Sequence, residues 1–214
     1  VMVESSERSA EGRVLLRDRP ERGQHVCHRG QDLARGAAVL APGQRLRAAD
    51  LAVLASVGAD PVPVFARPRV AIWTSGDELV PPSALPGPGQ IREGNTLHLA
   101  ALARAAGAEV VDQGIVRDDP EALTGRFARA LERCDALVTT GGVSMGEYDF
   151  VGRALEQAGV VPVFHKVAIK PGKPLWFGMR GAVPVFALPG NPVSCLVNHV
   201  VFVAPALALL GGEE

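Results

Sequence analysis

The chain has 214 residues, of which 47% are hydrophobic and 21% are charged, proportions typical of a soluble globular protein. This length is enough for one sizeable α/β domain with a smaller piece attached. The formal net charge of -1 gives no overall field that would attract nucleic acid or an anionic membrane, so any anion must bind at a local site.

Composition divides the chain into three parts. Residues 1–20 are polar and charged and are predicted to be a poorly ordered or truncated end. Residues 21–66 are rich in Gly and Arg, and their short apolar runs predict a small β-rich module with one helix between residues 47 and 57. Residues 67–214 are predicted to form an α/β domain.

In this third part, strands and helices alternate. Apolar runs predict strands at residues 70–73, 109–116, 136–140, 160–169, 176–178 and 183–186. Apolar residues at helical spacing predict helices at residues 95–106, 120–133, 149–158 and from 192 onward, with N-caps at Asn95, Asp119 and Asn191. The alternation predicts a three-layer fold, a mostly parallel sheet with helices on both faces. Because such sheets bind ligands at the carboxyl ends of their strands, four strand ends are candidate sites.

Cysteine usage and hydropathy narrow the class further. The cysteines, Cys27, Cys134 and Cys195, have no CxxC spacing, which predicts reduced thiols of a cytoplasmic protein rather than disulfides or a zinc site. The first residues lack the apolar stretch of a signal peptide. The most apolar segment, 193–210, is interrupted by an asparagine, a histidine and a proline, so a buried or half-buried helix is predicted rather than a membrane span.

Carboxylates follow the first two strands of the domain. Segment 74–78 combines two hydroxyls, a glycine and two carboxylates, which suit a metal or a polarised substrate, although a capped turn explains them as well. Asp118 follows the second strand and, unlike Asp119, is not explained as a helix cap. A carboxylate over the sheet edge there is a hard-oxygen ligand suited to Mg²⁺.

A glycine-rich loop follows the third strand. Gly141 and Gly142 would let backbone N–H groups approach a ligand closely, and Ser144 adds a hydroxyl. The loop is not a P-loop, because no Gly-Lys-Ser/Thr follows the glycines. With Glu147 and Asp149 attached, a loop that binds anion and metal together is as well supported as a plain turn.

Lysines and a helix start form the fourth strand end. Lys166, Lys170 and Lys173 fall within eight residues, and the even spacing of the first two puts both on one face if they share a strand. The helix start at Asn191 presents free N–H groups to an anion. Each piece alone is more often a solvated turn or an ordinary helix start. Together with the carboxylates, they predict a Mg²⁺-dependent enzyme acting on a phosphorylated or oxyanionic small molecule. Asp118 and Asp149 are expected to face one cleft into which Lys166 and Lys170 point, with Lys173 partly exposed.

Five motifs, in this order, resemble those of the molybdopterin molybdenumtransferase family of the MoeA type, which includes the carboxy-terminal domain of gephyrin. They are Ser-Gly-Asp-Glu-Leu at 75–79, Gly-Ile-Val-Arg-Asp-Asp at 114–119, Gly-Gly-Val-Ser-Met-Gly-Glu-Tyr-Asp at 141–149, Ala-Ile-Lys-Pro-Gly-Lys-Pro at 168–174 and Leu-Pro-Gly-Asn-Pro-Val-Ser at 188–194. Upstream, Arg-Gly-Gln-Asp-Leu at 29–33 is similar to the family's Arg-Gly-Glu-Asp-Ile. The resemblance runs from about Gly23 to the C-terminus.

The resemblance implies the family's reaction, the Mg²⁺-dependent insertion of molybdenum from molybdate into adenylylated molybdopterin with release of AMP. It implies catalytic roles for Asp32, Glu78, Asp118, Asp149, Lys166 and Lys170, with Glu78, Asp118 and Asp149 as metal ligands. The residues implied to bind substrate are Ser75, Gly76, Asp77, Gly141, Gly142, Val143, Ser144, Lys173, Pro189, Gly190, Asn191 and Ser194.

The resemblance also implies a cytoplasmic homodimer whose active site is completed by the partner subunit. Asp32 is therefore expected far from Asp149 within one chain. A molybdopterin adenylyltransferase is the implied partner enzyme, and no nucleic acid or membrane partner is implied.

The sequence departs from the family's pattern in several places. Thr-Ser replaces the family's Ser-Thr at 74–75, and Gln31 replaces a glutamate. The early Met-Asp-Gly-Tyr-Ala motif, most of the second domain and the C-terminal β-barrel domain have no counterpart, which implies either a fragment or a shortened member. Two alternatives stay open. One is a molybdopterin adenylyltransferase, whose Gly-Gly-Thr-Gly loop differs from Gly-Gly-Val-Ser at 141–144, and the other is a shortened non-catalytic pterin-binding or scaffold module.

Overall fold

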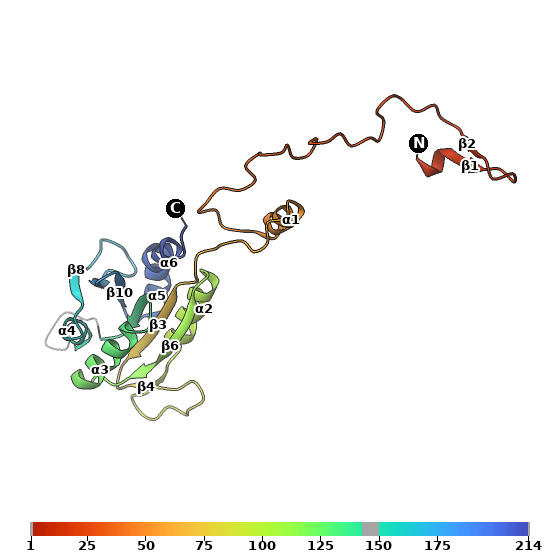
Figure 1. Ribbon diagram of the computed structural model, residues 1–214. Coiled ribbons are helices and arrows are strands. Elements are labelled where there is room, and N and C mark those ends of the chain that lie inside the picture. The colour runs from red at the N-terminus through yellow and green to blue at the C-terminus, as the bar shows by residue number, and fades with distance from the viewer. Residues whose placement is uncertain (1, 143–149, 214) are drawn as a thin grey trace.

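An arm at the N-terminus extends away from the rest of the protein (Figure 1). The structure is a computed structural model that describes residues 2–142 and 150–213. The arm begins with a 3-10 turn, Val3–Ser5, and a hairpin of strands β1 (Ser6–Arg8) and β2 (Val14–Leu16). It ends at helix α1 (Ala48–Ser56).

The arm differs from the prediction in where its strands lie. They fall within the first twenty residues, for which no folded unit was expected, whereas residues 21–66 hold the one predicted helix and no strand. The hairpin buries no core, because Val14, Leu15 and Leu16 are each more than half exposed. Backbone pairing and an exposed ion pair between Arg17 and Glu7 therefore hold it together.

The central sheet has six strands in the order β6-β3-β7-β10-β9-β8. The strands are β3 (Arg69–Ser75), β6 (Glu109–Val116), β7 (Ala136–Thr140), β8 (Val161–His165), β9 (Trp176–Arg180) and β10 (Val183–Leu188). Strands β6, β3, β7 and β10 are parallel, and β9 is antiparallel to both of its neighbours, so β8 runs in the same direction as β10. The predicted mostly parallel sheet is confirmed. Two further strands, β4 (Leu79–Val80) and β5 (Ile91–Arg92), pair with each other and are too short to show a period in the sequence.

Helices cover both faces of the sheet (Figure 1). One face carries α2 (Asn95–Ala105), α5 (Pro192–Asn198), a π-helical segment (His199–Val203) and α6 (Ala204–Leu210), and the other carries α3 (Pro120–Leu131) and α4 (Phe150–Gln157). A hydrophobic core lies on each face of the sheet, and successive side chains along a strand point into alternate cores. In β3, Val70 and Ile72 pack towards α2, whereas Ala71 and Trp73 pack towards α3. Strands β3, β7 and β10 are apolar on both faces because both of their faces are buried.

Helix caps confirm two sequence predictions and correct a third. Asp119 accepts a hydrogen bond from the Ala122 N–H (2.7 Å), and Asn191 accepts from the Val193 and Ser194 N–H groups (3.0 and 3.3 Å). Asn95 was predicted to cap α2, but it is the first residue of that helix and its amide contacts another element.

The apolar C-terminal stretch packs against the sheet. In the described part of the chain, Pro192–Leu210 is the one helical stretch whose length and composition would suit a membrane span, a test that core helices of soluble proteins also pass. Cys195, Val203 and Leu207 are buried against the sheet. The helix is thus half-buried, as predicted.

The three cysteines are unpaired. Cys134 and Cys195 are buried, and burial raises the pKa of each thiol to about 11, which makes both inert at neutral pH. Cys27 is exposed on the arm.

His199, at the start of the π-helical segment, makes stability depend on pH. It is 3% exposed, and burial, aided by the neighbouring His98, lowers its pKa from 6.5 to about 4. The unfolded chain therefore binds this proton more tightly than the folded chain does. The contribution of neutral His199 to the free energy of unfolding is fully present above pH 6.5 and is lost as pH falls towards 4.

We expect the free energy of unfolding of the natural chain to fall between pH 6.5 and pH 4 by about 3 kcal/mol more than that of His199→Gln. Urea unfolding at pH 7, 5.5 and 4.5 measures this difference. Parallel pH curves for the two chains would contradict it.

Candidate functional site

The strand ends predicted to carry function meet at one edge of the sheet. Ser75 is level with Val116, Thr74 with Thr140 and Thr140 with Leu188, so β3, β6, β7 and β10 end together. Strand β8 ends at the same edge, because His165 is level with Trp176, and Trp176 with Ala187. We call this edge, with the segments that follow the strands, the carboxyl edge.

Ser75 and Asp118 place unpaired oxygens at one end of the carboxyl edge. Ser75 ends β3 and is 2% exposed, and Asp118 lies two residues beyond β6 and is half-buried. The Ser75 Oγ and Asp118 Oδ1 atoms are buried, and within the described residues neither has a partner at hydrogen-bond geometry. Asp77 Oδ1 accepts a hydrogen bond from the Asp118 N–H (3.3 Å) and so ties the two segments together.

The electrostatics of Asp118 resemble those of a binding site. Burial raises the pKa of its carboxyl group, the charges of Asp77 and Glu78 raise it further, and the Ser75 hydroxyl opposes the rise. Asp77 and Glu78 are themselves exposed. Three carboxylates gathered with buried oxygens left unpaired favour a cation at this end of the edge.

Gly141 and Gly142 lie directly against Ser75. Both have left-handed backbones, with φ of 90° and 58°. A β-carbon at Gly141 would collide with the Ser75 carbonyl oxygen, and one at Gly142 would lie 3.0 Å from Ser75 Oγ and 2.7 Å from Val151. Only glycines allow this approach, so their sequence signature reflects contact between two strand ends.

Asn95 joins the ends of β7 and β10. Its Nδ2 donates to the Gly190 carbonyl oxygen (2.7 Å) and lies 3.5 Å from the Thr140 Oγ1 atom. The Thr140 hydroxyl donates to the Pro189 carbonyl oxygen (2.9 Å), which also accepts from the Cys195 thiol (2.8 Å). The segment that begins α5 is thereby fixed beside the glycine loop.

A buried glutamate holds the start of α2 in place. Glu93 is 5% exposed and accepts from the Thr96 N–H (2.6 Å) and the Thr74 hydroxyl (3.2 Å), and the hydroxyls of Thr74 and Thr96 are 2.8 Å apart. This network positions Asn95. Sequence reasoning missed Glu93, Thr96 and Thr140 and assigned Asn95 only a capping role. The one sequence feature that could have pointed to them is the Glu-Gly-Asn tripeptide before the apolar helix. A tripeptide is too short to show a periodic pattern.

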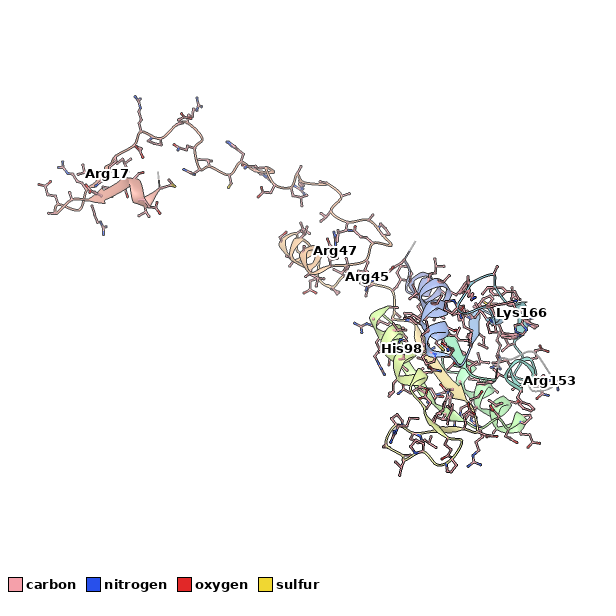
Figure 2. The ribbon with its side chains drawn as sticks, turned by 180° about the vertical axis from the view of Figure 1, so that it is seen from behind. Arg17, Arg45, Arg47, His98, Arg153 and Lys166 are labelled. Carbon is pink, nitrogen blue, oxygen red and sulfur yellow. The ribbon has the colours of Figure 1, made fainter. Side chains whose placement is uncertain are left out.

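The lysines occupy the loop between β8 and β9. Lys166, Lys170 and Lys173 are all exposed. Lys166 directly follows β8 with a left-handed backbone (φ 72°), and Lys170 lies outside any strand, so the two do not share a strand face. Figure 2 shows Lys166 on the side of the domain away from the arm.

Asp118 and Lys166 lie at opposite ends of the carboxyl edge. Five strand-to-strand steps separate β6 from β8. At about 4.8 Å per step, they place Asp118 and Lys166 roughly 24 Å apart. Lys166 therefore does not lie beside Asp118, and that Lys166 and Lys170 point into one cleft with Asp118 stays a prediction. Any single ligand contacting both must be extended.

The remaining predicted residues fall into three groups. Gly76 and Ser194 are buried at the edge, while Gly190 and Asn191 are exposed there and Pro189 is buried. Asp32 is exposed on the arm, in the stretch that Figure 2 shows between Arg17 and Arg45. Val143, Ser144 and Asp149 lie outside the described residues.

The donor set at the Asp118 end fits Mg²⁺ better than a transition metal. In residues 2–142 and 150–213, no group of three His, Cys, Asp or Glu side chains is arranged to hold a metal by itself. Mg²⁺ commonly uses one or two carboxylates together with substrate phosphates and water. The unpaired Asp118 Oδ1 and Ser75 Oγ atoms match that pattern of partial coordination.

The chain is similar to several proteins of known name. "Molybdopterin molybdenumtransferase" from Nostoc sp. is 37% identical over 215 residues, 99% of this chain and 49% of the relative. "Molybdopterin molybdenumtransferase 2" from Mycobacterium tuberculosis is 39% identical over 210 residues, 93% of this chain and 50% of the relative. The chain thus spans about half the length of the curated relatives it matches.

Solved structures agree with these relatives. A molybdopterin biosynthesis MoeA protein from Pyrococcus horikoshii superposes with a TM-score of 0.80 at 34% identity, covering 99% of this chain and 52% of that one. A molybdenum cofactor biosynthesis protein B structure, at 17% identity and a TM-score of 0.51, shares the fold.

Family comparisons cover nearly the whole chain. Residues 1–58 match the MoeA N-terminal region (domain I and II), so the expectation that the resemblance begins at Gly23 was wrong. Residues 71–209 match the probable molybdopterin binding domain. With that match over most of its length, the chain belongs to the molybdopterin-binding domain family, in the MoeA type that its motifs resemble.

Proposed function

We propose that this chain acts in molybdenum cofactor biosynthesis by inserting molybdenum from molybdate into adenylylated molybdopterin, with release of AMP. The observation that carries the proposal is the carboxyl edge, where an unpaired buried carboxylate and a lysine loop lie at opposite ends. Relatives named molybdopterin molybdenumtransferase, 35–39% identical, support it.

The length of the edge suits an extended substrate. Adenylylated molybdopterin carries a pyrophosphate between a nucleoside and a pterin, so its polar groups are spread along one axis. A row of roughly 24 Å can engage both ends of such a molecule. The substrate-binding residues proposed along it are those predicted from the sequence, with Asn95 and Thr140 holding the central loops.

Mg²⁺ is the proposed cofactor at the Asp118 end. Bound there, it would neutralise charge on the pyrophosphate as the bond to AMP breaks. Asp118 is the proposed ligand, and Glu78 and Asp149 are proposed to complete the set. The Asp77 side chain, which accepts a hydrogen bond from the Asp118 N–H, holds the Asp118 segment in place. Lys166 and Lys170 are proposed to neutralise molybdate at the other end.

Mass-spectrometric detection of AMP tests the proposal directly. With adenylylated molybdopterin, we expect AMP release that requires Mg²⁺ and rises when molybdate is added. No AMP under any condition would favour the scaffold alternative. Transfer of AMP from ATP onto molybdopterin would favour the adenylyltransferase alternative.

Lys170→Ala tests the anion end of the site. A charge-assisted contact contributes roughly 1.5–3 kcal/mol, so we expect molybdate to bind at least about tenfold more weakly. Isothermal titration with molybdate measures the affinity, and Arg104→Ala, exposed in the last turn of α2, is the charge-matched control. Equal affinities for Lys170→Ala and the natural chain would rule Lys170 out.

Asp32 tests a cytoplasmic homodimer with shared sites. Because Asp32 lies on the extended arm, we propose that it acts at the partner's carboxyl edge. Mixing Asp32→Asn with Asp149→Asn chains should restore part of the activity that each loses, since one of the two sites in a mixed dimer is intact. A purified mixed dimer without recovered AMP release would show that Asp32 does not act across subunits.

A molybdopterin adenylyltransferase is the proposed partner enzyme. Its product is the proposed substrate of this chain, so the two activities are consecutive.

A further inference from the structure

The lysine loop, residues 166–175, is fastened to α5 by one buried side chain. Asn198, which is fully buried, donates from Nδ2 to the Gly172 carbonyl oxygen (3.1 Å) and to the Ser194 carbonyl oxygen (3.0 Å). Over the residues that the structure describes, this is the only side-chain hydrogen bond joining the loop to another element. The path of the loop therefore depends on Asn198.

The backbone of the loop is shaped for this contact. Gly172 is buried with φ of 112°, and a β-carbon on it would lie 2.7 Å from Asn198 Nδ2. Two backbone hydrogen bonds join the two ends of the loop. The Lys166 N–H donates to the Leu175 carbonyl oxygen (2.7 Å), and the Val167 N–H donates to the Lys173 carbonyl oxygen (3.0 Å). Gly172, which lies between Lys170 and Lys173, is thus held from outside the loop by Asn198.

The amide of Asn198 is only half used. Its Nδ2 atom satisfies two carbonyl groups, but its Oδ1 atom is buried without a hydrogen-bond partner among the described residues. An unpaired buried acceptor costs about 1–3 kcal/mol, and an apolar side chain of similar size would avoid that cost. Asn198 carries this cost and its Nδ2 atom donates to the Gly172 carbonyl oxygen of the loop. Such a residue is suited to positioning the loop.

We propose that Asn198 is a positioning residue that sets where the lysines of this loop stand over the carboxyl edge. The inference rests on the proposed function, because it assumes that Lys170 binds the molybdate oxyanion. Without the Nδ2 donor, the loop is free to move away from α5. The lysines then spend less time where the anion binds, and the anion binds more weakly.

Asn198→Leu removes the donor while keeping the volume, and Asn198→Ser provides a second variant with a small side chain. We expect molybdate to bind each about three- to tenfold more weakly, measured by isothermal titration. Mn²⁺ binding at the Asp118 end, followed by electron paramagnetic resonance, should stay unchanged, because the hydrogen bonds of Asn198 go to Gly172 and Ser194 and not to the Asp118 segment. Val203→Ala, fully buried in the same helical stretch, controls for lost stability and should leave both affinities unchanged.

A double-mutant cycle tests the contact itself. Gly172→Ala presses a methyl group against Asn198 Nδ2 and strains the backbone, so it should weaken molybdate binding. In the Asn198→Ser chain only the strain remains, and the same change should have a smaller effect.

Two results would overturn the inference. If Lys170→Ala weakens molybdate binding but both Asn198 variants bind it normally, Asn198 has no positioning role and the proposed function stands. If Lys170→Ala itself binds molybdate normally, Lys170 is not the anion ligand and the inference about Asn198 falls with it, while the AMP-release assay still decides the proposed reaction.

Discussion

Gly141→Ala should lower the free energy of unfolding by about 3 kcal/mol or more, which corresponds to roughly 10 °C in the unfolding midpoint. The added methyl group would collide with the Ser75 carbonyl oxygen, and Gly141 has a left-handed backbone with φ of 90°. Ser75 is part of β3 in the middle of the sheet and cannot move without disturbing its neighbours.

Gly107→Ala separates the collision from the backbone strain. Gly107 ends α2 with φ of 88°, and a β-carbon there would meet no atom within 4 Å. Gly107→Ala should therefore lower the free energy of unfolding by only about 1 kcal/mol. Thermal unfolding followed by circular dichroism compares the two, and equal losses would show that Ser75 does not crowd Gly141.

Asp118→Asn should reduce Mg²⁺-dependent AMP release by about a hundredfold or more while making the protein more stable. The loss follows from removing the proposed metal ligand. The gain follows from the pKa of Asp118, which burial raises above its ordinary value of 3.8. The protonated group thus contributes stability that is present below pH 3.8 and is lost as pH rises through the raised pKa, so at pH 7 the ionised group opposes folding.

We expect the unfolding midpoint of Asp118→Asn to rise by about 1–3 °C at pH 7, and the difference to vanish below pH 3.8. Asp119→Asn is the matched control, because asparagine caps a helix as well as aspartate does. It should change neither stability nor AMP release. A fall in the midpoint of Asp118→Asn would show that the carboxylate is structural.

Most of the α/β domain could be predicted from the sequence because its signals are local. Strand β7 was placed at its observed bounds, and α3 was started at its observed residue, since Asp119 caps it through a bond three residues away. A periodic apolar pattern and a capped first turn act within a few residues. The arm lacks such a pattern, and there the predicted strands were displaced.

The candidate site was predictable in its residue types but not in its arrangement. The sequence by itself determined that carboxylates, glycines and lysines follow particular strands, because strand ends can be read from local pattern. Only the tertiary structure decided that Asn95 contacts Gly190 rather than capping its own helix, that Gly141 touches Ser75, and that Lys166 lies five strand steps from Asp118. Strand order and contacts between residues far apart in the chain depend on how the layers pack. Packing of this kind produces no periodic pattern that could be recognised in the sequence.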